Sequence, residues 1–254
     1  MFDGMIDIHS HTLWDVDDGA RSFDESVEMC FMADDTGTKT LFLTPHLMYW
    51  ERAEELYDIR EMKVEQLAET LDENFSGLIL KKGFEILCDD EIFNIKYFKP
   101  YTLNGSRYLL IEFDFFKTSE SDVVSWCNYI TSFGLVPIIA HPERYGFVLD
   151  NPACVNTLSK IGALFQLNAG SPAGMFGEEE ADVACEMLNK GYGDFIGSDA
   201  HSLFSRNTDM FACIDAYPEF IDAELLHKAA VDNPQFILQD KKYVPLRLGY
   251  ISDI

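Results

Sequence analysis

The sequence predicts an α/β protein folded as a distorted TIM-like (β/α)7 barrel, and three observations support this prediction. Seven short segments are rich in apolar residues, as strands buried in a parallel sheet are. Helical patterns lie between them, and strands that alternate with helices imply a parallel sheet. The length of 254 residues suits one barrel, so we expect a single domain over residues 1–254. The spacing alone also fits a doubly wound open sheet.

The elements follow one another in a regular order along the chain. The first helix should begin at the capping box Ser22-x-x-Glu25. A segment with neither helical nor strand pattern, residues 87–104, should be irregular. The predicted strands are residues 5–8, 40–44, 78–84, 108–113, 136–140, 163–167 and 194–197. The other predicted helices are residues 52–74, 121–133, 152–160, 178–189 and 223–231.

The composition restricts the partners and the compartment. A formal net charge of −25 opposes both the phosphate backbone of nucleic acid and an anionic membrane surface. The chain shows no signal-peptide pattern and no apolar run of the roughly 20 residues that a membrane span needs. Six scattered cysteines without a C-x-x-C pair are typical of reduced, buried thiols. We therefore expect a cytoplasmic protein that neither binds nucleic acid nor inserts into a membrane.

Histidines and carboxylates gather where the predicted strands end. Five of the six histidines lie at or just past such an end, whereas His227 lies on the last helix and is interpreted as an ordinary surface residue. His9 and His11 are two residues apart, so on extended backbone their side chains point to the same side. In a parallel barrel these strand ends meet at one mouth. The nine candidate metal ligands are His9, His11, Asp18, His46, Glu85, Glu112, His141, Asp199 and His201.

A metal cluster is the simplest explanation of this pattern. Carboxylates brought so close would repel one another unless cations neutralise them. Nitrogen and oxygen ligands without a thiolate suit Mn, Fe, Co or catalytic Zn, and nine ligands are enough for two or three divalent ions. Three ions would bring about +6 against about −4 from the four carboxylates, which leaves roughly +2 to attract an anion. Arg144 and Arg206 lie next to these ligands and suit bidentate capture of phosphate, with a salt bridge to a neighbouring acid as the alternative.

The same residues occur in six recognisable stretches: DIHSHTLWDVDDGA, TPH, GFE, YLLIEF, PIIAHPERY and IGSDAH. In this order they resemble the polymerase and histidinol phosphatase superfamily. More narrowly, they are similar to the bacterial manganese-dependent protein-tyrosine phosphatases of capsular and exopolysaccharide synthesis, the CpsB/YwqE type. The sequence departs from the family at Leu13-Trp14 and Leu47-Met48, which bears on substrate preference.

The resemblance implies a fold, a metal site and a reaction. It implies a (β/α)7 barrel with a trinuclear site, most often manganese, held by the nine candidate ligands, with Asp18 rather than Asp17 at the ligand position. It gives Arg144 and Arg206 phosphate-binding roles. The implied substrate is the phosphotyrosine-containing tail of a bacterial tyrosine kinase. A hydroxide that bridges two metals would attack phosphorus in line, and His201 or Asp18 would pass a proton to the leaving group.

Two other functions remain open at this point. One is a small-molecule phosphomonoesterase of the histidinol-phosphatase type, which should have a closed, selective pocket. The other is a regulatory partner that binds the kinase tail with little turnover. A cysteine phosphatase is excluded, because no cysteine is followed by arginine in the spacing Cys-x5-Arg.

Two further features lie near the predicted mouth. The glycines of the stretch NAGSPAGMFG, at positions 170, 174 and 177, form neither a dinucleotide nor a Walker motif, so we interpret the stretch as a strand-to-helix loop. Aromatic residues near strand ends either stack on a phosphotyrosine ring or pack in the core and rim. They are Trp14, Tyr49, Trp50, Phe115 and Phe116.

Overall fold

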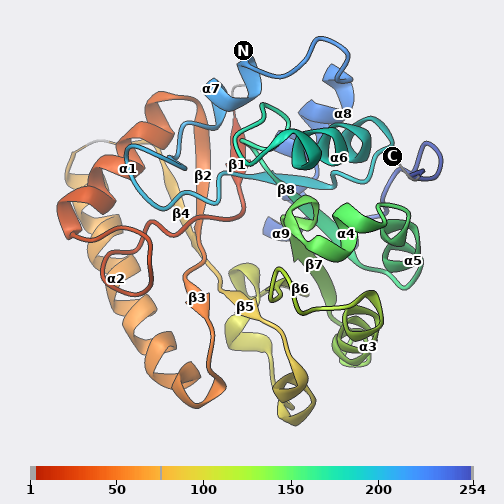
Figure 1. The fold of residues 1–254 in the computed structure, drawn as a ribbon. Helices are drawn as coiled ribbons and strands as arrows, with labels where there is room; N and C mark the ends of the chain where they lie inside the picture. The colour runs from red at the N-terminus through yellow and green to blue at the C-terminus, as the bar shows by residue number, and fades with distance from the viewer. Residues whose placement is uncertain (1–3, 75, 253–254) are drawn as a thin grey trace.

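The computed structural model describes residues 4–74 and 76–252, and in it parallel strands alternate with helices (Figure 1). Each of the seven predicted strand segments contains a strand, and two short strands, β3 and β5, follow the second and third of them. The strands are β1 (Met5–Asp7), β2 (Thr38–Leu43), β3 (His46–Leu47), β4 (Ile79–Lys82), β5 (Glu85–Leu87), β6 (Tyr108–Glu112), β7 (Val136–Ala140), β8 (Leu164–Asn168) and β9 (Phe195–Gly197).

The helices agree with the predicted order and add three short ones that the patterns did not predict: α4, α7 and α9. Residues 87–104 are irregular as predicted and hold three short 3₁₀ turns. The predicted helix over 223–231 is a short α8 that continues as a π-helical turn, Lys228–Asp232. The helices are α1 (Phe23–Asp35), α2 (Ala53–Glu73), α3 (Glu120–Thr131), α4 (Gly146–Asp150), α5 (Cys154–Lys160), α6 (Glu178–Asn189), α7 (Met210–Asp215), α8 (Ala223–His227) and α9 (Pro234–Leu238).

The start of α1 differs in one detail from the predicted capping box. Ser22 is the N-cap, and its hydroxyl accepts a hydrogen bond from the backbone N–H of Glu25. The Glu25 carboxylate in turn accepts from the backbone N–H of Arg21, one residue earlier than a capping box requires. The predicted helix start is therefore confirmed. Of the two hydrogen bonds of a capping box, the one from Glu25 N–H to the Ser22 hydroxyl is present, and the return bond goes to Arg21 instead of Ser22.

All strand pairs are parallel, and they form two parts. One part has the order β1-β2-β4 and the other the order β3-β5-β6-β7-β8-β9. The parts continue into each other, because Gly83 N–H donates to Leu43 O just before Glu85 N–H donates to Pro45 O. Past the ends of β1 and β9, a parallel bridge joins Ser10 to Ala200. The mixed α/β fold with a curled parallel sheet is confirmed, whereas the closed seven-stranded barrel stays a prediction.

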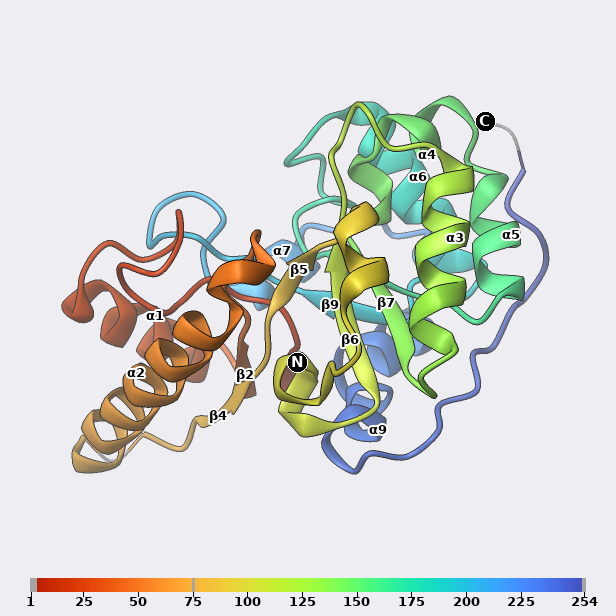
Figure 2. The same ribbon diagram turned by 90° about the horizontal axis from the view of Figure 1, so that it is seen from below.

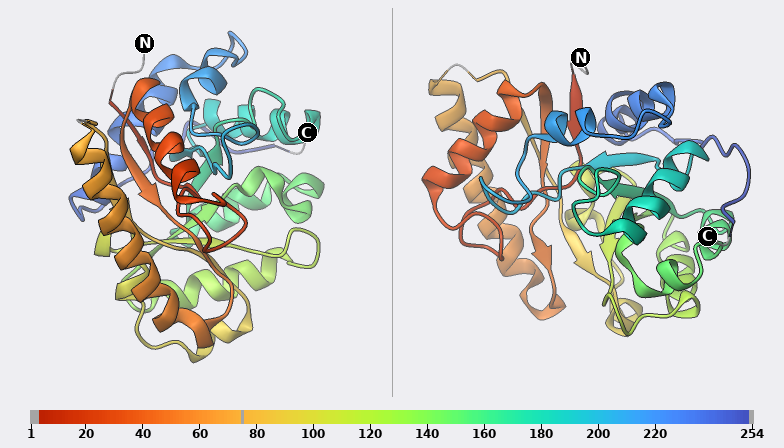
Figure 3. Two further views of the ribbon diagram at one scale, coloured as in Figure 1. Left: turned by 90° about the vertical axis from the view of Figure 1, so that its left-hand side faces the viewer. Right: turned by 45° about the horizontal axis from the view of Figure 1, so that its top comes forward.

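The sheet is buried on both faces, as a parallel sheet requires. Side chains alternate along β6: Tyr108 and Leu110 join Ile6, Phe42 and Ile138 in a cluster inside the curl. Helices cover the outside, with α1 and α2 against β2 and β4 and α3 against β7 (Figure 2). Figure 3 shows α1 and α2 side by side. The curl leaves the carboxyl ends of the strands at one end of the sheet.

An ion pair and hydrogen bonds to Tyr108 of β6 join the extended C-terminal segment to the sheet. The Arg247 guanidinium donates to both carboxylate oxygens of Asp194, at 2.8 and 2.9 Å, and stacks on the Tyr192 ring. Asp194 is fully buried at the start of β9, and it also accepts from Phe165 N–H. Burial raises the pKa of Asp194 despite this pairing. The carboxylate therefore depends on a residue from the C-terminal segment.

Replacing Arg247 with alanine is expected to lower the free energy of unfolding by about 3–5 kcal/mol, because it leaves a buried carboxylate without its partner. Urea unfolding of the wild type and the variant measures this difference. The matched control is Arg247→Ala combined with Asp194→Asn. The second change removes the unpaired buried charge of Asp194 and should recover part of the lost unfolding free energy. A single variant as stable as the wild type would contradict a structural role for this pair.

Two further observations concern the whole chain. No helix in the described ranges is both long and apolar enough to cross a bilayer. All six cysteines lie in the described part of the chain; there each is free, and five are buried. Burial raises the pKa of the Cys127 thiol to about 12, so this thiol stays protonated and unreactive.

Candidate metal centre

The nine predicted ligands lie together where the strands end. His9 and His11 follow β1 and His141 follows β7, whereas Glu85 begins β5 and Glu112 ends β6. Eight of the nine form three overlapping groups, within each of which the ligand atoms lie no more than 4.8 Å apart. The groups are His11, Asp18, His46 and His201; His9, His11, Glu85 and Asp199; and His46, Glu85 and Glu112. The ninth residue, His141, contacts the same cluster through Nε2, which lies 2.9 Å from Glu85 Oε1.

The deepest group centres on two histidine rings. His9 Nε2 and His11 Nε2 are 3.1 Å apart, and each lies 3.1 Å from Glu85 Oε2. Both nitrogens also lie 3.5 Å from Asp199 Oδ1. All four side chains are almost completely buried. Two ring nitrogens and two carboxylate oxygens thus face one small space, which is a donor set that suits a divalent cation.

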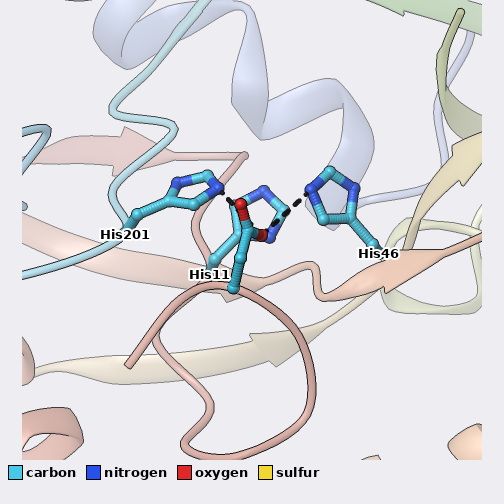
Figure 4. Close-up of side chains that lie close together, drawn as sticks. His11, His46 and His201 are labelled. Carbon is cyan, nitrogen blue, oxygen red and sulfur yellow. Dashed lines mark ion pairs between the residues drawn. The ribbon is translucent and has the colours of Figure 1, made fainter. Parts of the chain in front are cut away.

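The other two groups share His46, and the one that includes Asp18 opens toward solvent. His46 Nδ1 lies 2.7 Å from Glu112 Oε1 and 3.1 Å from Glu85 Oε2. Its Nε2 lies 3.4 Å from Asp18 Oδ1, and His201 Nε2 lies at the same distance from that oxygen. Figure 4 shows the rings of His11, His46 and His201 around one space. Because the Asp18 side chain is 71% exposed, this group forms the outer edge of the cluster.

Unpartnered buried atoms provide a test of whether metal ions fit here. His46 Nδ1, Glu85 Oε2 and His141 Nδ1 are buried and make no well-formed hydrogen bond within the described residues, although the first two lie at ion-pair distances from charged neighbours. Buried polar atoms are normally satisfied, and those that are not require an explanation such as an ion. Two of the three atoms belong to the groups above. The residues present therefore fit bound cations.

The cluster carries opposite charges that stabilise one another. Burial opposes a charged His46 ring, but Glu85 and Glu112 outweigh it and raise the pKa of His46 to about 10. Burial likewise opposes ionised Glu85, but His9 and His46 hold the pKa of that carboxyl well below its usual range. A proton on His46 thus supplies positive charge that a cation would otherwise supply. Metal binding at this ring must displace that proton, so metal affinity should rise with pH.

A chain of amides sets the orientation of His9. The Asp199 carboxylate accepts from Asn168 Nδ2 at 2.7 Å, and Asn168 Oδ1 accepts from Gln166 Nε2 at 3.0 Å. Gln166 Oε1 is therefore left to accept from His9 Nδ1, at 2.7 Å. This bond places the proton on Nδ1 and leaves Nε2 for a metal ion. The sequence analysis missed both amides, which lie within the apolar strand β8.

Replacing Gln166 with leucine is expected to weaken metal binding about 10- to 100-fold, because His9 loses the acceptor that orients its ring. Titration of the metal-free protein with Mn²⁺ by calorimetry measures this change. Gln235→Leu, on helix α9, serves as the control with the same chemical change. Equal Mn²⁺ affinity in Gln166→Leu and the wild type would show that the ring is held by packing alone.

A tight loop between His11 and α1 places two acids with different roles. Asp17 Oδ2 accepts from His11 Nδ1 at 2.7 Å and from His46 N–H at 2.9 Å. Gly19 closes this loop against the backbone, since a Cβ there would lie 2.0 Å from His11 O. Asp17 therefore orients a histidine, whereas Asp18 reaches into the cluster. The sequence analysis considered only which of the two is a ligand, not this orienting role.

Two arginines reach the cluster from its outer side. Arg144 Nη1 lies 3.4 Å from Asp199 Oδ2, and Arg206 Nη2 forms an ion pair with the same oxygen. Both side chains remain partly exposed, so their other N–H groups can bind an anion. Phe115 stacks on the His141 ring and lies under the Arg144 guanidinium, 4.8 Å from its ring centre. Phe115 thus helps to hold the His141 ring and the Arg144 guanidinium in place.

The other aromatic residues divide between packing and exposure. Trp14 packs edge-on against Phe23, and Trp50 packs edge-on against Phe98. Phe116 is 93% exposed. For the two tryptophans the structure therefore favours the packing role.

Two hollows flank Asp18 at the surface. One, of about 770 Å³, is lined by His201, Arg206 and the start of α1. The other, of about 360 Å³, is lined by His46, Tyr49 and apolar side chains. The cluster is therefore open on two sides rather than enclosed.

Fold and site together define a class: an α/β protein with a parallel sheet whose strand ends bring together histidines and carboxylates able to hold metal ions. A family model described as capsular polysaccharide synthesis, CpsB/CapC, matches residues 5–239, and the chain belongs to this family.

Individual relatives agree with this family. The chain is 33% identical over 207 residues to the putative tyrosine-protein phosphatase CapC of Staphylococcus aureus, covering 80% of this chain and 79% of the relative. It is 32% identical over 247 residues to the tyrosine-protein phosphatase CpsB of Streptococcus pneumoniae, covering 93% and 99%. Among solved structures, one chain from the crystal structures of YwqE from Bacillus subtilis and CpsB from Streptococcus pneumoniae, described as unique metal-dependent tyrosine phosphatases, matches with a TM-score of 0.83 at 29% identity, covering 95% of this chain and 97% of that one.

Proposed function

We propose that this chain is a metal-dependent protein-tyrosine phosphatase. The observation that carries the proposal is the pairing of two features at the carboxyl ends of the strands. Three overlapping groups of histidines and carboxylates can hold cations there. Two arginines meet at Asp199, a member of the deepest of those groups. Such a site combines positive charge with bidentate donors for phosphate.

The proposed cofactor is two or three divalent ions, with Mn first and Fe, Co or Zn as alternatives. Bound ions of this kind supply an activated water and neutralise charge on the phosphoryl group. The ligand set without thiolates supports a catalytic rather than a structural site. The proposed ligands are His9, His11, Asp18, His46, Glu85, Glu112, His141, Asp199 and His201.

The remaining residues bind the substrate and handle its proton. Arg144 and Arg206 hold phosphoryl oxygens with N–H groups that face away from Asp199. His201 and Asp18 lie together at the outer edge, where either can pass a proton to the leaving group. A tyrosine phenol has a pKa of about 10 and leaves more readily than an alkoxide, so this assistance is modest.

The proposed substrate is the phosphotyrosine-containing tail of a bacterial tyrosine kinase in capsular or exopolysaccharide synthesis. The proposed compartment of the enzyme is the cytoplasm. The two hollows beside Asp18 support a peptide substrate, because a metabolite enzyme should enclose its ligand. We further propose that residues 1–254 act as one domain with seven β/α units. Residues 1–3, 75 and 253–254 of that domain lie outside the described residues.

Metal-dependent hydrolysis of a phosphotyrosine peptide tests the proposal. After chelation, the wild type should regain turnover with Mn²⁺, and His141→Ala should not. His227→Ala, on α8, is the control histidine and should behave as the wild type. Rapid cleavage of histidinol phosphate with no peptide turnover would assign the chain to the small-molecule phosphatases. Tight peptide binding without turnover of either substrate would indicate a regulatory partner.

A further inference from the structure

The loop between β8 and α6 carries an aromatic side chain into the arginine pair. The Arg144 guanidinium lies over the Phe176 ring, 4.4 Å from its centre, and the Arg206 guanidinium lies 6.0 Å from the same centre. Phe176 offers no ligand atom to the metal groups, and neither the family motifs nor the proposed mechanism gives it a role. It is the one side chain whose ring lies within cation–π distance of both arginines in the described part of the chain.

Hydrogen bonds within the loop and at its base hold the backbone that precedes this ring. At its base, the Ser171 hydroxyl donates to the buried Glu143 carboxylate at 2.6 Å. Gly174 turns the backbone with a φ of +82°, a conformation that side chains disfavour, and its N–H donates to Ser171 O. Met175 N–H then donates to Gly170 O at 3.0 Å. A loop closed by these bonds presents Phe176 as its next residue.

Stacking constrains a guanidinium without using its hydrogen-bond donors. A ring under the guanidinium plane leaves the N–H groups at its edge free to bind an anion. Arg144 Nη1 donates to Asp199 Oδ2, Arg206 Nη2 forms an ion pair with the same oxygen, and Arg206 Nε is buried with no partner among the described residues. Each guanidinium thus contacts both Asp199 and Phe176, and Arg144 also contacts Phe115. Because both arginines meet at the same carboxylate oxygen and the same ring, an anion beside them can accept from both.

We propose that Phe176 is a positioning residue for phosphate binding, which sets the planes of Arg144 and Arg206 for a tetrahedral oxyanion. This inference rests on the proposed function for the identity of the anion. The glycine-bearing loop lies outside the phosphatase motifs, and the inference gives this loop a role in anion binding.

The test is orthophosphate binding to the Mn²⁺-loaded protein by calorimetry. Phe176→Leu removes the ring face and should raise the Kd for orthophosphate about 3- to 10-fold, with Mn²⁺ content unchanged. Phe176→Tyr keeps the ring and should stay within about twofold of the wild type. Met175→Leu, the neighbouring residue on the same loop, is the control and should bind as the wild type does.

A double-mutant cycle distinguishes positioning from a general structural effect. If Phe176 acts through the arginine, Phe176→Leu should cost less phosphate affinity in an Arg144→Lys background than in the wild type. An equal loss in both backgrounds would overturn the proposal, as would an unchanged Kd in Phe176→Leu. A tyrosine variant as weak as the leucine variant would do the same. Should Phe176→Leu fail to fold, Phe176→Met takes its place in the same cycle.

The outcome is separable from that of the proposed function. Peptide turnover by the wild type tests the phosphatase activity without any change at Phe176. If the wild type binds orthophosphate but turns over no phosphopeptide, the calorimetric comparison still decides the role of Phe176. In an active enzyme, the inhibition constant of orthophosphate should rise with the calorimetric Kd across the variants.

Discussion

Replacing Glu85 with glutamine is expected to reduce metal-dependent phosphopeptide turnover on the order of 10³-fold or more. Glu85 Oε2 lies 3.1 Å from ring nitrogens of His9, His11 and His46 and belongs to two of the three ligand groups. Glutamine keeps the shape but removes the negative charge, so two cation positions lose a ligand together. Initial rates at saturating Mn²⁺, with metal content measured in parallel, give the result.

The control for this variant is Glu65→Gln, on the exposed face of α2, which should match the wild type. The Glu85 variant should also bind less metal. Full activity with full metal content in Glu85→Gln would remove the carboxylate from the proposed ligand set. A loss of activity with full metal content would indicate that Glu85 affects the reactivity of the bound ions rather than their binding.

The second large effect is expected at the arginines. Arg144→Ala or Arg206→Ala should lower kcat/KM for a phosphopeptide about 10²- to 10³-fold, because each removes charged donors that the proposed mechanism assigns to the phosphoryl group. Bound metal should stay unchanged, since neither arginine belongs to a ligand group. Steady-state kinetics with metal analysis measures both quantities.

Arg107→Ala is the matched control for the arginine variants. Arg107 pairs with Asp240, away from the cluster, and its loss should leave kcat/KM within about twofold of the wild type. A drop of less than tenfold in Arg206→Ala would support the alternative in which this arginine serves mainly as a salt bridge to Asp199.

Much of the fold could be predicted because its strands are apolar runs that end in polar residues. The breaks within the sheet were harder to predict. Pro45 has no N–H to donate and separates β2 from β3, although the pairing continues past it through its carbonyl. A similar break at Gly83 separates β4 from β5. A pattern of apolar residues does not distinguish such an interrupted strand from one that ends.

The supporting residues of the site illustrate a different limit. Gln166 and Asn168 lie in a fully buried strand, where an isolated amide in a sequence gives no sign of its partner. Their role follows only from spatial neighbours far along the chain, such as His9 and Asp199. Phe176 likewise lies in a loop that the glycines predicted. Its contact with the arginines could not be predicted, because it depends on how the backbone turns at Gly174.

The pairing of Asp194 with Arg247 has a consequence for how the family's sequences vary. The family model matches residues 5–239, so Arg247 lies outside the shared region while Asp194 lies inside it. Burial of a carboxylate at the start of β9 lowers stability, and a cation supplied by the same chain offsets part of this effect. We therefore expect the two positions to covary, with an apolar or amide residue in place of Asp194 in relatives whose C-terminal segments lack the arginine.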